Sequence, residues 1–215
     1  AMAPFRYHRD TIAGLLADYP LTVAFTRQDS LAVAATFARL QSIVPALERH
    51  LGPYRWHAIG YSGTPTGSME HINNSALNAG LLTAQNPSDH SVVSHELAHA
   101  WFGNLVTCSS PDDMWFNEGG ASFTEELATC AAFGTEAAHD LMQQYMRLAL
   151  QGDDGMQPAL YAPAFRSIYG ATTYKKGAMV WRALRHYLGD SLFFPALQRL
   201  FSVCAFSNIT SEALC

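Results

Sequence analysis

The sequence predicts an α+β fold in which a small mixed β-sheet lobe, about residues 1–80, precedes a mainly α-helical lobe, about residues 81–215. The first third of the chain contains short runs that alternate apolar with smaller residues, a pattern typical of strands. From residue 88 onward, apolar residues recur at helical spacing. No repeat, low-complexity tract or linker divides the chain, so we expect a single domain.

The sheet lobe begins with a strand candidate at 21–25, and a second strand candidate covers 54–62. Between them, a helix is indicated by an N-cap signal at 29–30 and by apolar residues at helical spacing, namely Phe37, Leu40, Val44, Leu47 and Leu51. Pro45 lies inside this run and is expected to kink or split the helix. Gly52 and Pro53 end the run.

The segment 62–80 is rich in Gly, Ser, Thr and Asn, which favours an irregular edge strand with a turn at both ends. Beyond it, periodicity predicts the helices of the second lobe, about 89–103, 116–132, 135–150, 173–188 and 191–203. Ser88 or Asp89 is the expected N-cap of the first of these helices, and Gly103 with Asn104 is its expected end.

Composition excludes several classes of function. The formal net charge is -5 and no dense Lys/Arg run occurs, which argues against a nucleic-acid partner. No stretch approaches the unbroken apolar length of a membrane span. The four cysteines form no CxxC pair, so they predict neither a zinc knuckle nor a disulfide framework. The sequence leaves the cellular compartment open, and both ends look cut, as in an excised domain.

Two histidines and a glutamate stand on the first helix of the second lobe, in the segment SHELAHAWFGNLV at 94–106. His95 and His99, at i and i+4, project from one face, while Glu96 lies about 100° around the helix. If these three side chains were buried without partners, their burial would cost several kcal/mol. A bound dication would remove that cost. Two imidazoles at this spacing can both reach one Zn²⁺. Satisfied core histidines are the alternative.

A third ligand is available in the segment DDMWFNEGGASFTEEL. Glu118 opens a second helix, and 18 residues separate it from His99. A catalytic zinc site usually takes three protein ligands. Gly119 and Gly120 lack side chains, so we expect another helix to approach closely here.

HELAH followed after eighteen residues by NEG resembles the zinc signature of the aminopeptidase N family, gluzincin metallopeptidases with a thermolysin-like catalytic domain. The resemblance implies one Zn²⁺ per chain, held by His95, His99 and Glu118, with Glu96 as the general base. It also implies that Glu125, seven residues after the last ligand, contacts a zinc-binding histidine. A solvated helix position is the alternative for Glu125.

Two further segments match the family. Its Gly-Xaa-Met-Glu-Asn motif, which pairs with the substrate backbone and binds the substrate's α-ammonium through the glutamate, corresponds to GSMEH, that is Gly67, Ser68, Met69, Glu70 and His71. His71 replaces the asparagine, which puts the preference for the first substrate residue in doubt. The family's Tyr-Xaa-Lys-Gly segment corresponds to the residues that start at Tyr174. The resemblance implies that Tyr174 donates a hydrogen bond to the oxyanion of the tetrahedral intermediate. Tyr169, which lacks the following Lys-Gly, is the competing tyrosine.

The sequence therefore predicts a zinc aminopeptidase acting on peptides with a free N-terminus. A related zinc hydrolase, endopeptidase-like or epoxide-hydrolysing, and a non-catalytic scaffold of the same fold are the alternatives. Family members flank the catalytic domain with an N-terminal β domain and a C-terminal helical domain, and neither is in this chain. We expect these 215 residues alone to have weak or no peptidase activity.

Overall fold

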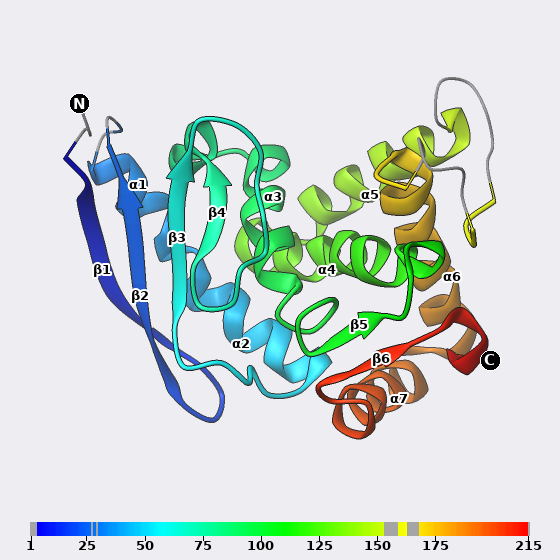
Figure 1. The fold of residues 1–215 in the computed structure, drawn as a ribbon. Coiled ribbons are helices and arrows are strands. Elements are labelled where there is room, and N and C mark those ends of the chain that lie inside the picture. Colours follow the sequence, from blue (N-terminus) through cyan, green and yellow to red (C-terminus); the bar gives the residue numbers. More distant parts are fainter. Residues whose placement is uncertain (1–3, 27, 29, 153–158, 163–167, 215) are drawn as a thin grey trace.

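A four-stranded mixed sheet forms the first lobe (Figure 1). The computed structural model describes residues 4–26, 28, 30–152, 159–162 and 168–214. The strands β1 (Arg6–Ala13), β2 (Asp18–Phe25), β3 (Ile59–Thr64) and β4 (Ser75–Asn78) are neighbours in that order. β1 pairs antiparallel with β2, and the other two pairs are parallel. The predicted strands fall on β2 and β3, whereas β1 was not predicted.

Helices α1 (Ser30–Ala38) and α2 (Leu40–Leu51) cross over from β2 to β3. The five apolar positions predicted for this helical run are all buried. The run divides at Arg39, whose carbonyl accepts from the N–H groups of Ser42 and Ile43, and Pro45 lies within α2. The proline therefore does not mark the division. Gly52 ends α2 as predicted, with a φ of 91° that favours glycine. The proposed cap residue Asp29 is outside the described residues.

The stretch Ser30–Leu51 is long and apolar enough to cross a membrane by length and composition, contrary to the expectation that no segment approaches a span. Its inward residues, among them Val33, Phe37, Ile43 and Leu47, belong to the hydrophobic core. Because the core helix of a globular protein passes the same test, this stretch is weak evidence for a membrane segment.

The irregular edge predicted at 62–80 is β4 together with one short bridge. Met69 exchanges two backbone hydrogen bonds with Ala76, of 3.0 and 2.9 Å, in antiparallel orientation. The segment before β4 thus folds back along that strand. A 3-10 turn, η1 (Ala79–Thr83), leads from β4 toward the second lobe.

Helix α3 (Pro87–Ala98) carries the HELAH segment. Its N-cap is Asn86, whose side chain accepts a hydrogen bond from Asp89 N at 2.8 Å, so the prediction of Ser88 or Asp89 was wrong. Pro87 explains why α3 starts earlier than predicted, because the fixed φ and the missing N–H of proline suit the first position of a helix. The regular helix ends at Ala98, before the predicted Gly103, which takes a φ of 117° in the following turn.

Helix α4 (Trp115–Phe133) is the centre of the second lobe and packs against α2, α3, α5 (Thr135–Gln151) and α6 (Gly177–Leu188). The π-helical turn η4 (Thr172–Lys176) runs directly into α6, and α7 (Asp190–Val203) follows. A parallel strand pair, β5 (Val106–Cys108) and β6 (Ser207–Ile209), was not predicted. It lies below α4 in Figure 1, and the short turns η2 (Pro111–Asp113) and η5 (Ser211–Leu214) complete the lobe.

Two glycines set the distance between α4 and α6. A Cβ on Gly119 would lie 2.8 Å from Gly177 Cα, and a Cβ on Gly177 would lie 2.9 Å from Gly119 Cα. A Cβ on Gly120 would meet the ring of Phe102 on its other side. The close approach of a second helix is therefore confirmed at Gly119, whereas at Gly120 the close neighbour is the side chain of Phe102.

Replacing Gly177 with alanine should destabilise the fold by about 1–3 kcal/mol, because the methyl group would have to push two backbones apart. In a helix with open space around the glycine, the same change stabilises by roughly 0.5–1 kcal/mol. A net loss of stability therefore indicates the close contact between Gly177 and Gly119. Urea unfolding of Gly177→Ala measures it. Gly80→Ala is the control, since its Cβ meets only Asn78 Oδ1, at 3.3 Å. Equal stability of Gly177→Ala and the parent protein would contradict the packing argument.

Candidate metal centre

Three buried ligand atoms converge where α3 faces the start of α4. Glu118 Oε2 lies 3.1 Å from His95 Nε2 and 3.3 Å from His99 Nε2, and the two Nε2 atoms are 3.1 Å apart. His95 lies in the last turn of α3, His99 is the C-cap residue of that helix, and Glu118 lies in the first turn of α4. The structure thus brings together the three residues that the sequence pattern singled out.

These atoms have the geometry that a zinc ion needs. A tetrahedral ion with ligands at about 2.1 Å holds its ligand atoms about 3.4 Å from one another, close to the distances found here. Two imidazole nitrogens facing each other in a buried site also need a proton or a cation between them. The residues fit a divalent metal, with no further protein ligand required for an open catalytic site.

A hydrogen-bond partner at Nδ1, the ring nitrogen that faces away from the cluster, fixes the orientation of each histidine. His95 Nδ1 lies 3.0 Å from Glu125 Oε1, and His99 Nδ1 donates to the Phe102 carbonyl at 2.8 Å. Tyr145 of α5 donates a short hydrogen bond to the other oxygen of Glu125. With Nδ1 protonated, both Nε2 atoms carry lone pairs toward the common point, the tautomer that metal binding requires.

Electrostatics in this cluster are strong. Burial lowers the pKa of His95, but hydrogen bonds to Glu118 and Glu125 outweigh it and raise that pKa to about 10. Burial likewise opposes ionisation of Glu118, yet the two histidines hold the pKa of its carboxyl well below the usual range. The pocket therefore favours a positive charge between the imidazoles and the carboxylate.

Glu96 and Glu70 lie on one side of the cluster. Glu70, Glu96 and His99 each have a polar atom within 4.8 Å of the others. Burial raises the pKa of Glu96 to about 7, and the charge of Glu70 adds to this although both histidines oppose it. Glu96 is thus poised to gain and lose a proton near neutral pH.

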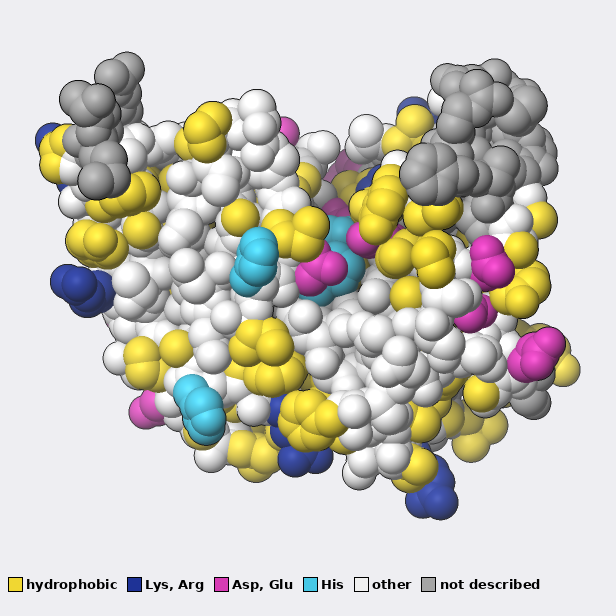
Figure 2. All heavy atoms as spheres, in the orientation of Figure 1, with side chains coloured by type: hydrophobic (Ala, Val, Ile, Leu, Met, Phe, Trp, Pro, Cys, Tyr) yellow, Lys and Arg dark blue, Asp and Glu magenta, His cyan; other side chains and the backbone are white. Residues whose placement is uncertain are grey.

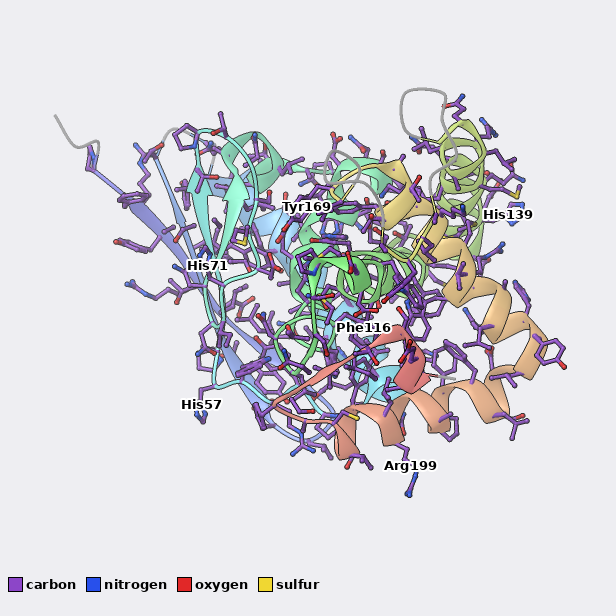
Figure 3. All side chains as sticks on the ribbon, turned by 45° about the vertical axis from the view of Figure 1, so that its right-hand side comes forward. His57, His71, Phe116, His139, Tyr169 and Arg199 are labelled. Carbon is purple, nitrogen blue, oxygen red and sulfur yellow. The ribbon has the colours of Figure 1, made fainter. Side chains whose placement is uncertain are left out.

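The GSMEH segment is fixed to the rest of the site through its backbone and one hydroxyl. Ser68 Oγ accepts from Asn78 N at 3.2 Å, and the Glu70 carbonyl accepts from Asn104 Nδ2 at 2.8 Å. Gly67 has a φ of 71°, which glycine tolerates. His71 is exposed on the loop before β4, and its N–H bonds to the Met69 carbonyl (Figure 3).

Tyr174 stacks on the ring of His95, with ring centroids 5.7 Å apart and planes 19° from parallel. It lies in the π-helical turn η4, a feature often found at functional sites. Burial and the nearby carboxylate of Glu118 raise its pKa, so the hydroxyl keeps its proton. Tyr169 also lines the site but is 69% exposed (Figure 3).

The metal-binding candidates, the two further glutamates Glu70 and Glu96, and both tyrosines open into one cavity of about 780 Å³, whereas Gly67 and His71 do not line it. Histidine and acidic side chains are visible on the floor of a hollow between two raised rims (Figure 2). The lining residues are Ser68, Met69, Glu70, Val92, His95, Glu96, His99, Met114, Asn117, Glu118, Glu125, Tyr145, Tyr169, Tyr174 and Lys175. A cavity of this size accommodates several amino-acid residues of a substrate.

Sequence reasoning missed three residues that shape the site, Tyr145, Lys175 and Asn104. Tyr145 and Lys175 contact Glu125 from elements remote in sequence, and nothing in the local pattern marks them. Asn104 was interpreted only as a helix end. Of the histidines outside the motif, His57 and His139 lie exposed at the periphery (Figure 3), and His90 is buried against the Thr36 carbonyl.

Solved structures of similar fold include an M1 zinc metallopeptidase from Deinococcus radiodurans, with a TM-score of 0.81 and 21% identity over 98% of this chain and 47% of that one. A second is yeast LTA4 hydrolase in complex with bestatin, with a TM-score of 0.80 and 22% identity over 96% of this chain and 35% of that one. These similarities confirm the predicted α+β fold.

Curated relatives are closer in sequence but much longer. Aminopeptidase M1 of Arabidopsis thaliana is 35% identical over 133 residues, covering 58% of this chain and 15% of that protein. Aminopeptidase N of Mus musculus is 36% identical over 129 residues, covering 55% of this chain and 13% of that protein. The chain thus spans about one seventh of the length of these relatives.

The family itself is identified by a model of the Peptidase family M1 domain, which matches residues 53–215. The matched range contains the HELAH and NEG segments, the GSMEH segment and Tyr174. It covers most of the chain, and the resemblance to the aminopeptidase N family is confirmed: this chain belongs to peptidase family M1.

Proposed function

We propose that this chain is the catalytic part of a zinc aminopeptidase, which removes the N-terminal residue from peptides. The observation that carries the proposal is the convergence of His95, His99 and Glu118 on one point, with Glu96 beside them in an open cavity. Zn²⁺ would be held by these three side chains, one ion per chain. When bound, it supplies Lewis-acid chemistry, acidifying water and polarising a carbonyl group.

Glu96 acts as the general base and then as the general acid. Its carboxylate takes a proton from the attacking water and delivers it to the leaving amine. Burial raises the pKa of Glu96 to about 7, which favours the protonated carboxyl needed in the second half of this role, and a bound cation would favour the carboxylate needed in the first half. Glu125 holds His95 through Nδ1, so that the imidazole keeps its orientation while the reaction proceeds.

Tyr174 donates a hydrogen bond to the oxygen that becomes negative in the tetrahedral intermediate. Its ring stacks on His95, which fixes the side chain beside the ligands, and its hydroxyl remains protonated. Tyr169 is a weaker candidate, because most of its side chain is in solvent.

Glu70 binds the α-ammonium of the substrate by a charge-assisted hydrogen bond. The proximity of Glu70 to Glu96 and His99 supports an amino terminus bound within about one residue of the reacting carbonyl, as in an exopeptidase. In the family's motif this segment pairs with the substrate backbone. Both backbone groups of Met69 already bond to Ala76, which leaves this role to Gly67 and Ser68, and His71 lies at the exposed end of the segment.

Zinc binding tests the proposal directly. After dialysis against zinc, the purified protein should contain about one zinc per chain, and Glu118→Gln should lose most of it because a site with two imidazoles binds weakly. Atomic absorption measures the content. Glu212→Gln is the matched control, since Glu212 is exposed and remote from the ligands. A parent protein that takes up no zinc would rule out the central claim.

Acetylation of the substrate tests the direction of attack. A tripeptide amide with a free amino group should lose its first residue about 10 to 100 times faster than its N-acetylated form, since charge-assisted hydrogen bonds are worth roughly 1.5–3 kcal/mol. Glu70→Gln should lower the ratio of the rate on the free peptide to the rate on the acetylated peptide. Glu96→Gln should abolish turnover of both. Chromatography detects even slow release. Equal rates on both substrates would favour the endopeptidase-like alternative.

The two tyrosines provide a paired test of oxyanion stabilisation. Tyr174→Phe should lower kcat about 100-fold to 1000-fold without changing the zinc content. Tyr169→Phe removes the same hydroxyl from the same cavity and should have little effect. If the two variants lose activity equally, the assignment to Tyr174 is wrong.

A further inference from the structure

The cavity has one cationic side chain that the proposed reaction does not use. Four carboxylates line the cavity, those of Glu70, Glu96, Glu118 and Glu125. Among the lining residues that the structure describes, Lys175 is the one Lys or Arg. It directly follows Tyr174 in the turn η4.

The ammonium group of Lys175 is held in place without being hydrogen-bonded. Its Nζ lies 3.6 Å from the centroid of the Tyr145 ring and 3.9 Å from Glu125 Oε1, and its side chain is 21% exposed. Within the described part of the chain, no oxygen accepts a hydrogen bond from it. Lys175 Nζ is not among the buried side-chain atoms that lack a partner, so its N–H donors are accessible to an acceptor that enters the cavity.

Glu125 does not supply that acceptor, because its nearer oxygen, Oε1, lies 3.9 Å from Lys175 Nζ, beyond hydrogen-bond distance. Oε1 faces His95 Nδ1 at 3.0 Å, and Oε2 accepts from Tyr145. Burial lowers the pKa of Lys175 while Glu125 and Glu118 oppose the shift. An incoming anion would offset this cost of burying the charge.

The position of Lys175 relative to the ligands suggests which anion it receives. Glu70 groups with His99 and Glu96, whereas Lys175 lies beyond the opposite ring nitrogen of His95. On the proposed function, which this step assumes, the α-ammonium lies at Glu70. The chain after the scissile bond then extends toward Lys175, at about 3.3–3.6 Å per residue.

We propose that Lys175 forms a subsite for a carboxylate of the substrate, one or two residues beyond the scissile bond. Two sources share this chemistry, the C-terminal carboxylate of a tripeptide and the side chain of an acidic residue directly after the bond. Either one would accept hydrogen bonds from the ammonium between Tyr145 and the open cavity.

Equilibrium binding tests the subsite without relying on turnover. In a zinc-loaded Glu96→Gln background, calorimetry compares Ala-Ala-Ala with its C-terminal amide, and Ala-Asp-Ala amide with Ala-Asn-Ala amide. The carboxylate member of at least one pair should bind about 10-fold tighter, the scale of a partly exposed charge-assisted hydrogen bond. Lys175→Met should abolish the difference and Lys175→Arg should retain it.

Lys176→Met is the matched control, because Lys176 is the next residue of η4 and does not line the cavity. It should leave the difference intact. Equal affinities within both pairs, no detectable binding at millimolar concentrations, or a difference that survives Lys175→Met would each overturn the proposal. So would an equal weakening of all four peptides by Lys175→Met, which indicates a structural role. Hydrolysis of Ala-Ala-Ala amide by protein with Glu96 intact tests the proposed function separately.

Discussion

The meeting of two imidazoles and one carboxylate in a buried space is the constraint on which the rest of this structure depends. Removing these groups from water costs free energy, unless a bound cation or shared protons compensate for their burial. They also have to come from two helices, and the helices have to be held within a few ångströms of each other. The packing of α4 against α3 and α6, with glycines at the closest point, provides that rigidity.

The parts of the site that lie on a single helix were predictable from sequence. His95 and Glu96 lie on α3, and His99 caps it with helical backbone angles, so their relative directions follow from the helical period. Glu125 follows from Glu118 on α4 in the same way. The partners of Glu125 were not predictable. Tyr145 and Lys175 reach it from α5 and η4, and which faces of these elements meet depends on tertiary packing that no local pattern specifies.

The fold shows the same division. Apart from the end of α3, the helices of the second lobe agree with the predicted ranges to within a few residues, because an apolar stripe indicates directly which face is buried. Strand β1 escaped prediction since it is an edge strand, mostly exposed, with RYHRDTIA offering little apolar alternation. The start of α3 was misplaced because Asn86 and Pro87 compete with Ser88 and Asp89 as capping residues, and the proline decides between them.

The shared contacts of Glu125 have a consequence for thermodynamics. One carboxylate touches a proposed metal ligand on one side and a lysine of the cleft on the other. Any ligand that draws the lysine away changes the charge around His95, and any change at His95 alters the field that the lysine feels. Linkage is reciprocal, so the free energy that the metal adds to ligand binding equals the free energy that the ligand adds to metal binding. On the proposed function, retention of the ion and choice of peptide would therefore not be independent properties of this site.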